Sequence, residues 1–485
     1  MRHLPLLAAL GVWVVLLGQL AARQRVPTAS DALEVPLATA ALSEGPAEEW
    51  FGLYLGERKI GHARRARQAM PSSHRLEDRA QLELSLLGVP QRLETWLVAE
   101  IDAAQRLRRF SFLLSSPATT VTAEGEQDAE GLRVQLDVDG HTQSVDIPLA
   151  EPVTLPLTLR PRIAARWPAA GSRFRHEVVD PLTLRPQTLV TEVEGVEIHG
   201  GVETLRLRET QRGLEARVWV DKRGRVVREE SGLGLAMVAE PRDEALRGVG
   251  SEPPIDLVLA ARVPLVGRVR GDPRAAGRLR LRVTGAAAGL VPDDPPRQRL
   301  RDGVLVIERE PWPLPALAAD ADAGGIDPRY LAPEPFVESD DPLVMAHARA
   351  AVGAARTDEE SAQRLVRWVY ETMRAEPAAT VPSARAVART LRGDCNEHAV
   401  LLTAMARAAG IPARVVAGAM YAEQGFVYHA WTELWLGRWI TADATLGQLP
   451  ADATHVKLVE GGPAEHLALG ALLGRLGFEV VDEDA

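Results

Sequence analysis

The amino-acid sequence predicts a multidomain protein in which an amino-terminal all-β region is followed by an α+β domain. Apolar and polar side chains alternate with a period of two from residue 49 to about residue 308, which is typical of half-buried antiparallel strands. From residue 341 the spacing changes to the helical period of about 3.6, and strand-like alternation returns after residue 413. Helices followed by a sheet indicate an α+β fold. The length of 485 residues is enough for two or three domains.

The chain begins with a segment that predicts export. A short basic start precedes residues 4–20, which are apolar with Gln19 as the one strongly polar interruption. Residues 1–23 are therefore expected to be a signal peptide or a membrane anchor, and the residues before Ala21 and Ala22 fit a cleavage site poorly. Residues 24–48 have the composition of a tether. We expect an exported protein of the periplasm or cell envelope, either released or anchored to the inner membrane by residues 4–20.

Two β-rich segments follow the tether. Residues 49–250 are expected to form an all-β domain, in which Arg223-Gly224 is typical of a hairpin turn. The histidines of this domain are scattered and predict no ligand cluster (His62, His74, His141, His176 and His199). A Pro-rich break opens a second segment, residues 251–316, which is either a small separate domain or the last strands of the first.

Residues 317–485 are the expected α+β domain. Capping residue types precede several apolar-periodic runs, and Gly410 followed by Pro412 is typical of a helix end. The expected helices span 341–355, 357–373, 383–391, 396–409 and 463–476. The expected strands span 414–418, 430–436 and 439–442, and Gly437-Arg438 is the turn between the last two.

Charge and cysteine content exclude several function classes. Lys and Arg total 56 against 66 Asp and Glu, a net charge of -10, which argues against nucleic acid as a partner because phosphate binding needs concentrated positive charge. A single cysteine permits neither an internal disulfide nor a thiolate metal cluster. His398 has no second ligand at helical spacing, and His455 and His466 have no partners in sequence, so we expect no metal site.

Cys395 is the candidate nucleophile. It follows Asp394, an N-cap residue type, and falls in the first turn of the expected helix. Free backbone N–H groups and the helix dipole stabilise a thiolate there, so we expect a thiol pKa below the free value of about 8.5. The same N–H groups suit the oxyanion that forms when a thiolate attacks an amide. The neighbouring Asp394 carboxylate would raise the thiol pKa mildly. The alternative is that Cys395 has only a packing role.

His429 and Asp443 are the candidate partners of the thiol. His429 lies in one expected strand and Asp443 in the next, at nearly equal distances from the turn between them, so we expect them side by side. His429 would serve as base and then acid, and Asp443 would fix its tautomer. Taken singly, His429 is explained as well by a structural role and Asp443 by a turn, but the three in this order favour chemistry. The expected substrate cleft comprises Asp394, Tyr428 and Trp431.

Four motif blocks within residues 330–460 resemble the transglutaminase-like superfamily of papain-type folds. They are Gly393-Asp394-Cys395-Asn396-Glu397-His398-Ala399, Ala409-Gly410-Ile411-Pro412-Ala413-Arg414, His429-Ala430-Trp431-Thr432-Glu433 and Trp439-Ile440-Thr441-Ala442-Asp443-Ala444-Thr445. The resemblance implies a papain-like α+β domain with a cysteine at a helix amino terminus packed on an antiparallel sheet. It also implies a Cys395–His429–Asp443 triad that forms a thioester from an amide substrate, with no metal or organic cofactor. The upstream β region is similar to that of exported bacterial members.

The expected function is thiol-dependent acyl transfer on peptide or isopeptide amides, with a protein or peptide as the substrate. A cysteine peptidase or amidase is favoured over a cross-linking transglutaminase because nothing in the sequence identifies an amine-binding site. The alternative is a non-catalytic peptide- or protein-binding module of the cell envelope, in which the β region is the functional surface.

Overall fold

The computed structural model describes most of the chain from residue 47 onward. The described residues are 47–86, 89–117, 119–138, 140–149, 153, 155–179, 186–211, 214–231, 234–248, 254, 262–285, 288, 291–315, 326–376, 383–422, 425–461, 469 and 475–481. The expected signal or anchor at residues 4–20 lies outside them. Within the described residues, no helix combines the length and the apolar character needed to span a membrane. The chain divides between Ile255 and Asp256 into two compact units.

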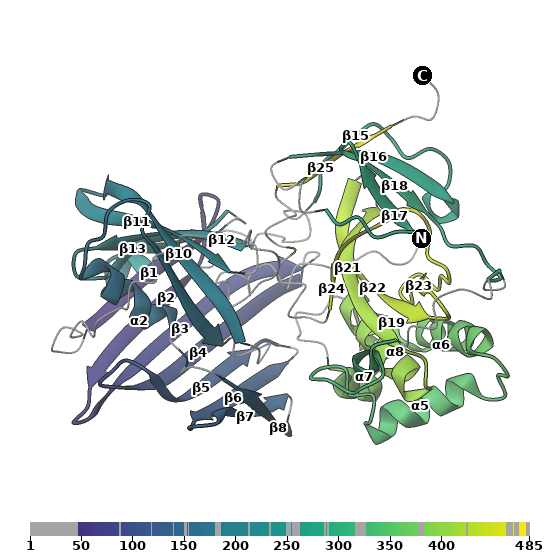
Figure 1. The fold of residues 1–485 in the computed structure, drawn as a ribbon, viewed down its shortest axis with the longest axis horizontal. Helices are drawn as coiled ribbons and strands as arrows, with labels where there is room; N and C mark the ends of the chain where they lie inside the picture. The colour runs from purple at the N-terminus through teal and green to yellow at the C-terminus, as the bar shows by residue number, and fades with distance from the viewer. Residues whose placement is uncertain are drawn as a thin grey trace. The chain divides into compact units, whose positions relative to one another are not determined.

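The unit before residue 256 is built on one 14-stranded antiparallel sheet with the order β8-β7-β6-β5-β4-β3-β2-β1-β14-β13-β12-β11-β10-β9, drawn in purple and teal in Figure 1. Its strands are β1 Ala47–Leu55, β2 Arg58–Ala69, β3 Ser73–Leu86, β4 Val89–Asp102, β5 Leu107–Ser115, β6 Thr120–Gln127, β7 Gly131–Val138, β8 His141–Pro148, β9 Arg173–Val179, β10 Pro186–His199, β11 Val202–Gln211, β12 Leu214–Asp221, β13 Val226–Ser231 and β14 Leu235–Ala239. Two runs of hairpins meet where β1 pairs with β14. On β7, Leu132, Val134 and Leu136 are buried and the residues between them are exposed, as the period of two requires. The all-β prediction for this region is confirmed.

A short helix, α2 Pro156–Ala164, carries a buried charge into this unit. Arg160 is 1% exposed, and its guanidinium lies 2.7 Å from Glu209 and 2.9 Å from Glu229. A buried arginine is tolerated only when its charge is paired and its N–H groups are bonded. The triad therefore ties α2 to strands β11 and β13. A second helix, α3, spans Arg242–Ala245.

The unit from Asp256 onward contains a five-stranded sheet with the order β15-β25-β16-β18-β17. Its strands are β15 Leu265–Val266, β16 Arg278–Thr284, β17 Gln298–Arg301, β18 Val304–Glu308 and β25 Gly477–Val480. Because β16 pairs with β25, the segment 251–316 shares its described sheet with the end of the chain and with no strand of the 14-stranded sheet. The buried Arg297 pairs with Glu310 and donates to the carbonyl oxygen of Asp452 at 2.6 Å, which fastens this sheet to the α+β core.

The α+β core combines a group of helices with a four-stranded sheet of order β23-β22-β21-β24. The helices are α5 Pro342–Val352, α6 Asp358–Thr372, α7 Ala384–Thr390 and α8 Cys395–Ala408; the strands are β21 Ala413–Ala422, β22 Gly425–Trp435, β23 Trp439–Ala442 and β24 His455–Glu460. A two-residue parallel pair, β19 Arg374–Ala375 and β20 Arg392–Gly393, precedes α8. Each helix is capped by a side chain of the expected type (Asp341, Thr357, Ser383 and Asp394). Helix α8 packs on β21 and β22 and is surrounded by α5, α6 and α7 (Figure 1).

Most helices and strands of the α+β core lie where the sequence predicts them. The helices expected at 341–355, 357–373, 383–391 and 396–409 correspond to α5, α6, α7 and α8, and the three expected strands correspond to β21, β22 and β23. Strand β24 was not predicted, because its short alternating run follows an irregular loop. The helix expected at 463–476 lies outside the described residues except for Leu469, Arg475 and Leu476.

Candidate active site

The start of α8 is shaped by the residues on either side of the cysteine. The Asp394 N–H donates to Glu397 Oε2 at 2.7 Å, and Asp394 Oδ1 accepts from the Asn396 N–H at 2.8 Å, so the two ends of a capping box are joined. Gly393 has a φ of +143°, and a Cβ there would lie 2.4 Å from Glu397 Cγ, so a side chain at this position is excluded. These local contacts make Cys395 the first residue of α8.

The thiol of Cys395 lies against strand β22. Its Sγ accepts a hydrogen bond from the backbone N–H of Ala430 at 3.2 Å, and Ala430 directly follows His429. One turn further along α8, Thr432 Oγ1 donates to the Ala399 carbonyl oxygen at 3.0 Å. Helix and strand are therefore bonded at successive turns, and the thiol and the imidazole come from two elements in direct contact.

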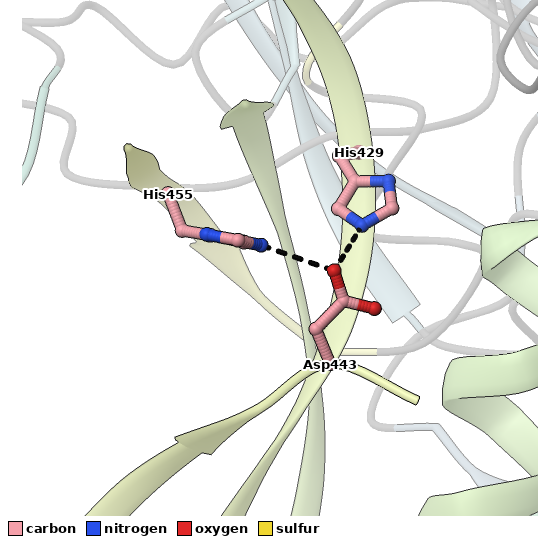
Figure 2. Close-up of side chains that lie close together, drawn as sticks. All are labelled: His429, Asp443 and His455. Carbon is pink, nitrogen blue, oxygen red and sulfur yellow. Dashed lines mark hydrogen bonds and ion pairs between the residues drawn. The ribbon is translucent and has the colours of Figure 1, made fainter. Parts of the chain in front are cut away.

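His429 and Asp443 are hydrogen-bonded, with Nε2 and Oδ2 2.8 Å apart (Figure 2). Strands β22 and β23 pair Thr432 with Ala442, and extending this register by one pair places Asp443 opposite Trp431. His429 is two residues from Trp431 on the same face of β22, so His429 and Asp443 are diagonal neighbours, which long side chains can bridge. The expectation that they lie close together agrees with this distance, although they are not directly opposed.

Asp443 is held in one orientation. Its Oδ1 accepts from the backbone N–H groups of Thr445 at 2.8 Å and Leu446 at 3.2 Å, which leaves Oδ2 for the imidazole. The side chain is fully buried. Burial by itself raises the pKa of a carboxyl group, but the interactions of Asp443 with His429 and then with His455 outweigh it and hold the pKa of Asp443 well below its ordinary value. Asp443 is therefore a carboxylate.

Cys395 departs from the sequence expectation of a lowered pKa. The residue is 0% exposed, and burial together with the neighbouring Asp394 charge raises the pKa of the thiol well above its ordinary value. The hydrogen bond from the Ala430 N–H lowers the pKa of the thiol but does not outweigh these two effects. Burial and Glu397 also raise the pKa of Asp394. The expectation was wrong because a helix amino terminus lowers a thiol pKa most where water and positive charge reach it.

The residues expected to line the substrate cleft are packed around the thiol. Asp394, Tyr428 and Trp431 are 2%, 2% and 1% exposed. Tyr428 Oη donates to Asn396 Oδ1 at 3.1 Å. The Trp431 indole is stacked near the His429 ring, with ring centroids 6.2 Å apart. In this conformation the three side chains form the walls of a closed site.

His455, for which the sequence indicates no partner, lies within the site. Nε2 of His455 is 3.1 Å from Asp443 Oδ2, the same oxygen that His429 contacts (Figure 2). His455 begins β24, which pairs with β21 on the side of the sheet away from β23. The loop between β23 and β24 thus brings it back to Asp443, and no spacing rule in the sequence signals such a return.

Among the described residues, His429, Asp443 and His455 also form a group whose side chains are of the types that bind metal ions. Their ligand atoms lie within 4.8 Å of one another. Both imidazole Nε2 atoms, however, point at Asp443 Oδ2 from 2.8 Å and 3.1 Å, as hydrogen-bond donors do. Hydrogen bonding accounts for the arrangement, and we assign no metal to it.

A free cysteine, a histidine and an aspartate on one helix and one sheet are the residue types that cysteine enzymes use. Comparison with known families narrows this class. Residues 346–444 match the family model of the Transglutaminase-like superfamily. No curated protein matches the sequence.

Several solved structures are similar to parts of the chain at low identity and low TM-score. A candidate cysteine protease from Cytophaga hutchinsonii is 17% identical over 46% of this chain and 88% of its own, with a TM-score of 0.28. A β-barrel-like protein from Brucella abortus is 10% identical over 40% of this chain and 94% of its own, with a TM-score of 0.32. The periplasmic domain of TgpA from Pseudomonas aeruginosa, bound to ethylmercury, is 24% identical over 32% of this chain and 64% of its own, with a TM-score of 0.22.

Proposed function

We propose that the protein is a cysteine hydrolase that cleaves peptide or isopeptide amides through Cys395, His429 and Asp443. Two contacts carry the proposal. His429 is bonded to Asp443, and Ala430, the residue after His429 on β22, donates to the Cys395 sulfur. The family match of residues 346–444 supports a thiol mechanism. The packing of α8 on an antiparallel sheet supports a papain-like version of the fold.

The proposed reaction uses the two nitrogens of His429 differently. Because Nε2 is bonded to the Asp443 carboxylate, Nε2 carries a proton and Nδ1 is left to accept one from the thiol. The thiolate attacks the carbonyl carbon, a C–S bond forms, and the C–N bond breaks as His429 protonates the leaving amine. Water, deprotonated by His429, then attacks the thioester, releases the acid and restores the thiol.

Two features of the resting site bear on this cycle. The raised pKa of Cys395 means that the thiol form predominates before substrate binds, so proton transfer to His429 must accompany attack. The sulfur is also 0% exposed, so substrate entry requires movement of the residues that cover it. We therefore expect slow reaction with small alkylating agents and faster acylation by a fitting peptide.

Hydrolysis is proposed over amine transfer because water, unlike a second amine, needs no binding site of its own. The same burial of the thiol favours one rival function, a non-catalytic module that binds a peptide or protein. In that case the bond between His429 and Asp443 would be a structural contact and the sulfur would stay covered.

Alkylation followed by mass spectrometry separates the two functions, because Cys395 is the single cysteine of the chain. The native protein and the His429→Ala variant are treated with iodoacetamide across pH 6–10, and each is also treated in urea as a reference for a free thiol. The enzyme predicts native alkylation that depends on His429 and is blocked by a substrate peptide. A thiol that reacts only after unfolding, in a protein that also cleaves no peptide, would exclude the enzyme.

Substrate class is tested with a quenched-fluorescence peptide library and, in parallel, a labelled primary amine. Hydrolysis predicts peptide cleavage by the wild-type protein, none by Cys395→Ala, and no label on acceptor peptides. Incorporation of the labelled amine at a rate above that of cleavage would instead indicate transfer.

We also propose that the protein is exported and that residues 4–20 direct it to the periplasm or cell envelope. A fusion of residues 1–48 to a phosphatase that is active only outside the cytoplasm tests this. Replacing Leu16 and Leu17 by Arg should abolish phosphatase activity, and activity unchanged by that replacement would contradict export through this segment.

A further inference from the structure

We propose that His455 is a positioning residue, held as an imidazolium between Asp443 and Asp452, that fixes the Asp443 carboxylate for His429. The inference rests on the proposed function, since it assigns His455 a role in the same reaction. Figure 2 shows the central part of the arrangement, with both imidazole rings directed at one carboxylate oxygen.

Both nitrogens of His455 face only acceptors. Nε2 lies 3.1 Å from Asp443 Oδ2. Nδ1 lies 3.1 Å from the carbonyl oxygen of Asp452 and 3.3 Å from its Oδ1. A neutral imidazole has one nitrogen with a lone pair, and in either tautomer that lone pair would be directed at an oxygen. The ring is 0% exposed, so no solvent relieves such a contact, and only the doubly protonated form satisfies both sides.

Asp452 is itself held in place as an anion. Its Oδ1 accepts from the Thr454 N–H at 2.8 Å and from Thr454 Oγ1 at 2.5 Å. Its Oδ2 accepts from the Arg274 guanidinium at 2.9 Å. A row of alternating charge therefore runs from Arg274 through Asp452 and His455 to Asp443, whose carboxylate bonds His429. Despite burial, the hydrogen bonds and charges around Asp452, first among them those of His455, hold its pKa below its ordinary value. The two carboxylates in turn hold the pKa of His455 above its ordinary value.

The position of the ring is fixed by the sheet as well as by charge. The His455 ring meets the Trp431 indole edge-on, with centroids 5.3 Å apart and planes at 88°, and Trp431 in turn stacks near His429. Gly418 on β21 makes this approach possible, because a Cβ there would lie 1.9 Å from the Val456 carbonyl oxygen. His455 thus supplies the second bond to Oδ2 and prevents the carboxylate from turning away from His429.

The charge of His455 has a consequence for titration. The groups that face His455 are Asp443, Asp452 and the ring of His429, whose centroid is 5.7 Å away, and Arg274 lies beyond Asp452. The charges of Asp394 and Glu397 at the start of α8, and of Asp443 after β23, all raise the pKa of the Cys395 thiol. A positive charge on His455 offsets the field of Asp443, so removing that charge should raise the pKa of the Cys395 thiol further.

The experiment compares His455→Gln with the wild-type protein in the full chain, and His347→Gln is the control. Glutamine can still donate one hydrogen bond to Asp443 but carries no charge. His347 is a half-buried histidine of the same unit that bonds the Ala388 carbonyl oxygen, outside the row. For His455→Gln we expect the limb of the kcat/KM pH profile that reports the Cys395 thiol to move upward by about one pH unit, with KM nearly unchanged. His347→Gln should leave the profile in place.

A second measurement keeps the proposal testable if His455→Gln fails to fold. In the wild-type protein, ¹⁵N NMR of the histidine rings should show both His455 nitrogens protonated at pH 7, and Asp452→Asn should lower the pH at which that proton is lost. A neutral His455 at pH 7, or unchanged pH limbs in a folded and active His455→Gln, would overturn the proposal. An inactive wild-type protein with a doubly protonated His455 would contradict the hydrolase and leave the assigned charge of His455 supported.

Discussion

His429 Nε2 and Asp443 Oδ2 are 2.8 Å apart even though the register of β22 and β23 places Asp443 opposite Trp431. The diagonal contact depends on the turn that follows β23. There the backbone of Asp443 exchanges two hydrogen bonds with Gln448, at 2.9 Å and 2.8 Å, and its Oδ1 is capped by the next backbone N–H groups. The aspartate is thus oriented by its own loop, and the strand pairing brings it only into range.

Replacing Asp443 by asparagine should lower kcat by about 10²- to 10⁴-fold with little change in KM. An amide N–H facing Nε2 favours the tautomer with the proton on Nδ1, which cannot accept a proton from the thiol. Steady-state cleavage of a peptide substrate measures the effect. The control is Asp340→Asn at an exposed position just before α5, and wild-type kcat in Asp443→Asn would refute the assigned role.

Replacing Asp394 by asparagine should lower the pKa of Cys395. After burial, the Asp394 charge is the largest cause that raises the thiol pKa, and asparagine is an equally good N-cap, so α8 should be retained. We expect the pH profile of iodoacetamide alkylation to shift to lower pH, with a several-fold faster reaction at pH 8. Asp358→Asn, in the exposed first turn of α6, is the matched control. An unchanged or upward-shifted profile in Asp394→Asn would show that the Asp394 charge does not raise the thiol pKa.

The buried carboxylates Asp443 and Asp452 should make stability depend on acid pH. Both have pKa values below those of an unfolded aspartate, about 3.9, so the stability they contribute is present above that pH and is lost as pH falls through their folded values. Urea midpoints measured between pH 2 and pH 6 should fall below about pH 4, and fall less steeply in Asp443→Asn. An identical slope in the variant would show that other groups govern the loss.

His455 should act in the opposite pH direction. Its folded pKa is raised above the unfolded value of about 6.5, so its contribution is complete below that pH and is lost as pH rises through the folded value. The difference in urea midpoint between the wild-type protein and His455→Gln should therefore shrink at alkaline pH. A difference that grows with pH would contradict the charged state.

Replacing Gly418 by alanine should destabilise the α+β core by about 1–3 kcal/mol or more, because the added Cβ would meet the Val456 carbonyl oxygen at 1.9 Å and the Trp431 ring at 2.9 Å. Separation of β21 and β24 would also displace His455, so activity should fall together with the melting temperature. Gly277→Ala is the control, since a Cβ there meets nothing within 4 Å. Equal melting temperatures for the two variants would contradict the close approach.

The helical half of the site could be predicted because its signals are local. Asp341, Thr357, Ser383 and Asp394 each bond a backbone N–H within three residues, so the sequence alone determines where the helices begin. The same holds for Cys395, whose place in the first turn follows from the capping box of Asp394 and Glu397. His429 and Asp443 could be predicted as neighbours because one short turn joins their strands.

The tertiary structure alone decided three features that depend on distant segments. The joining of two runs of hairpins by β1 and β14 unites residues almost 200 positions apart, such as Phe51 and Ala239. The burial of Cys395, which reverses the expected shift of its pKa, results from packing of α8 on β22. The placement of His455 on Asp443 requires β24 to pair with β21 rather than with β23. Hydrogen bonds within one turn are determined by neighbouring residues, whereas strand pairing and desolvation depend on the whole folded chain.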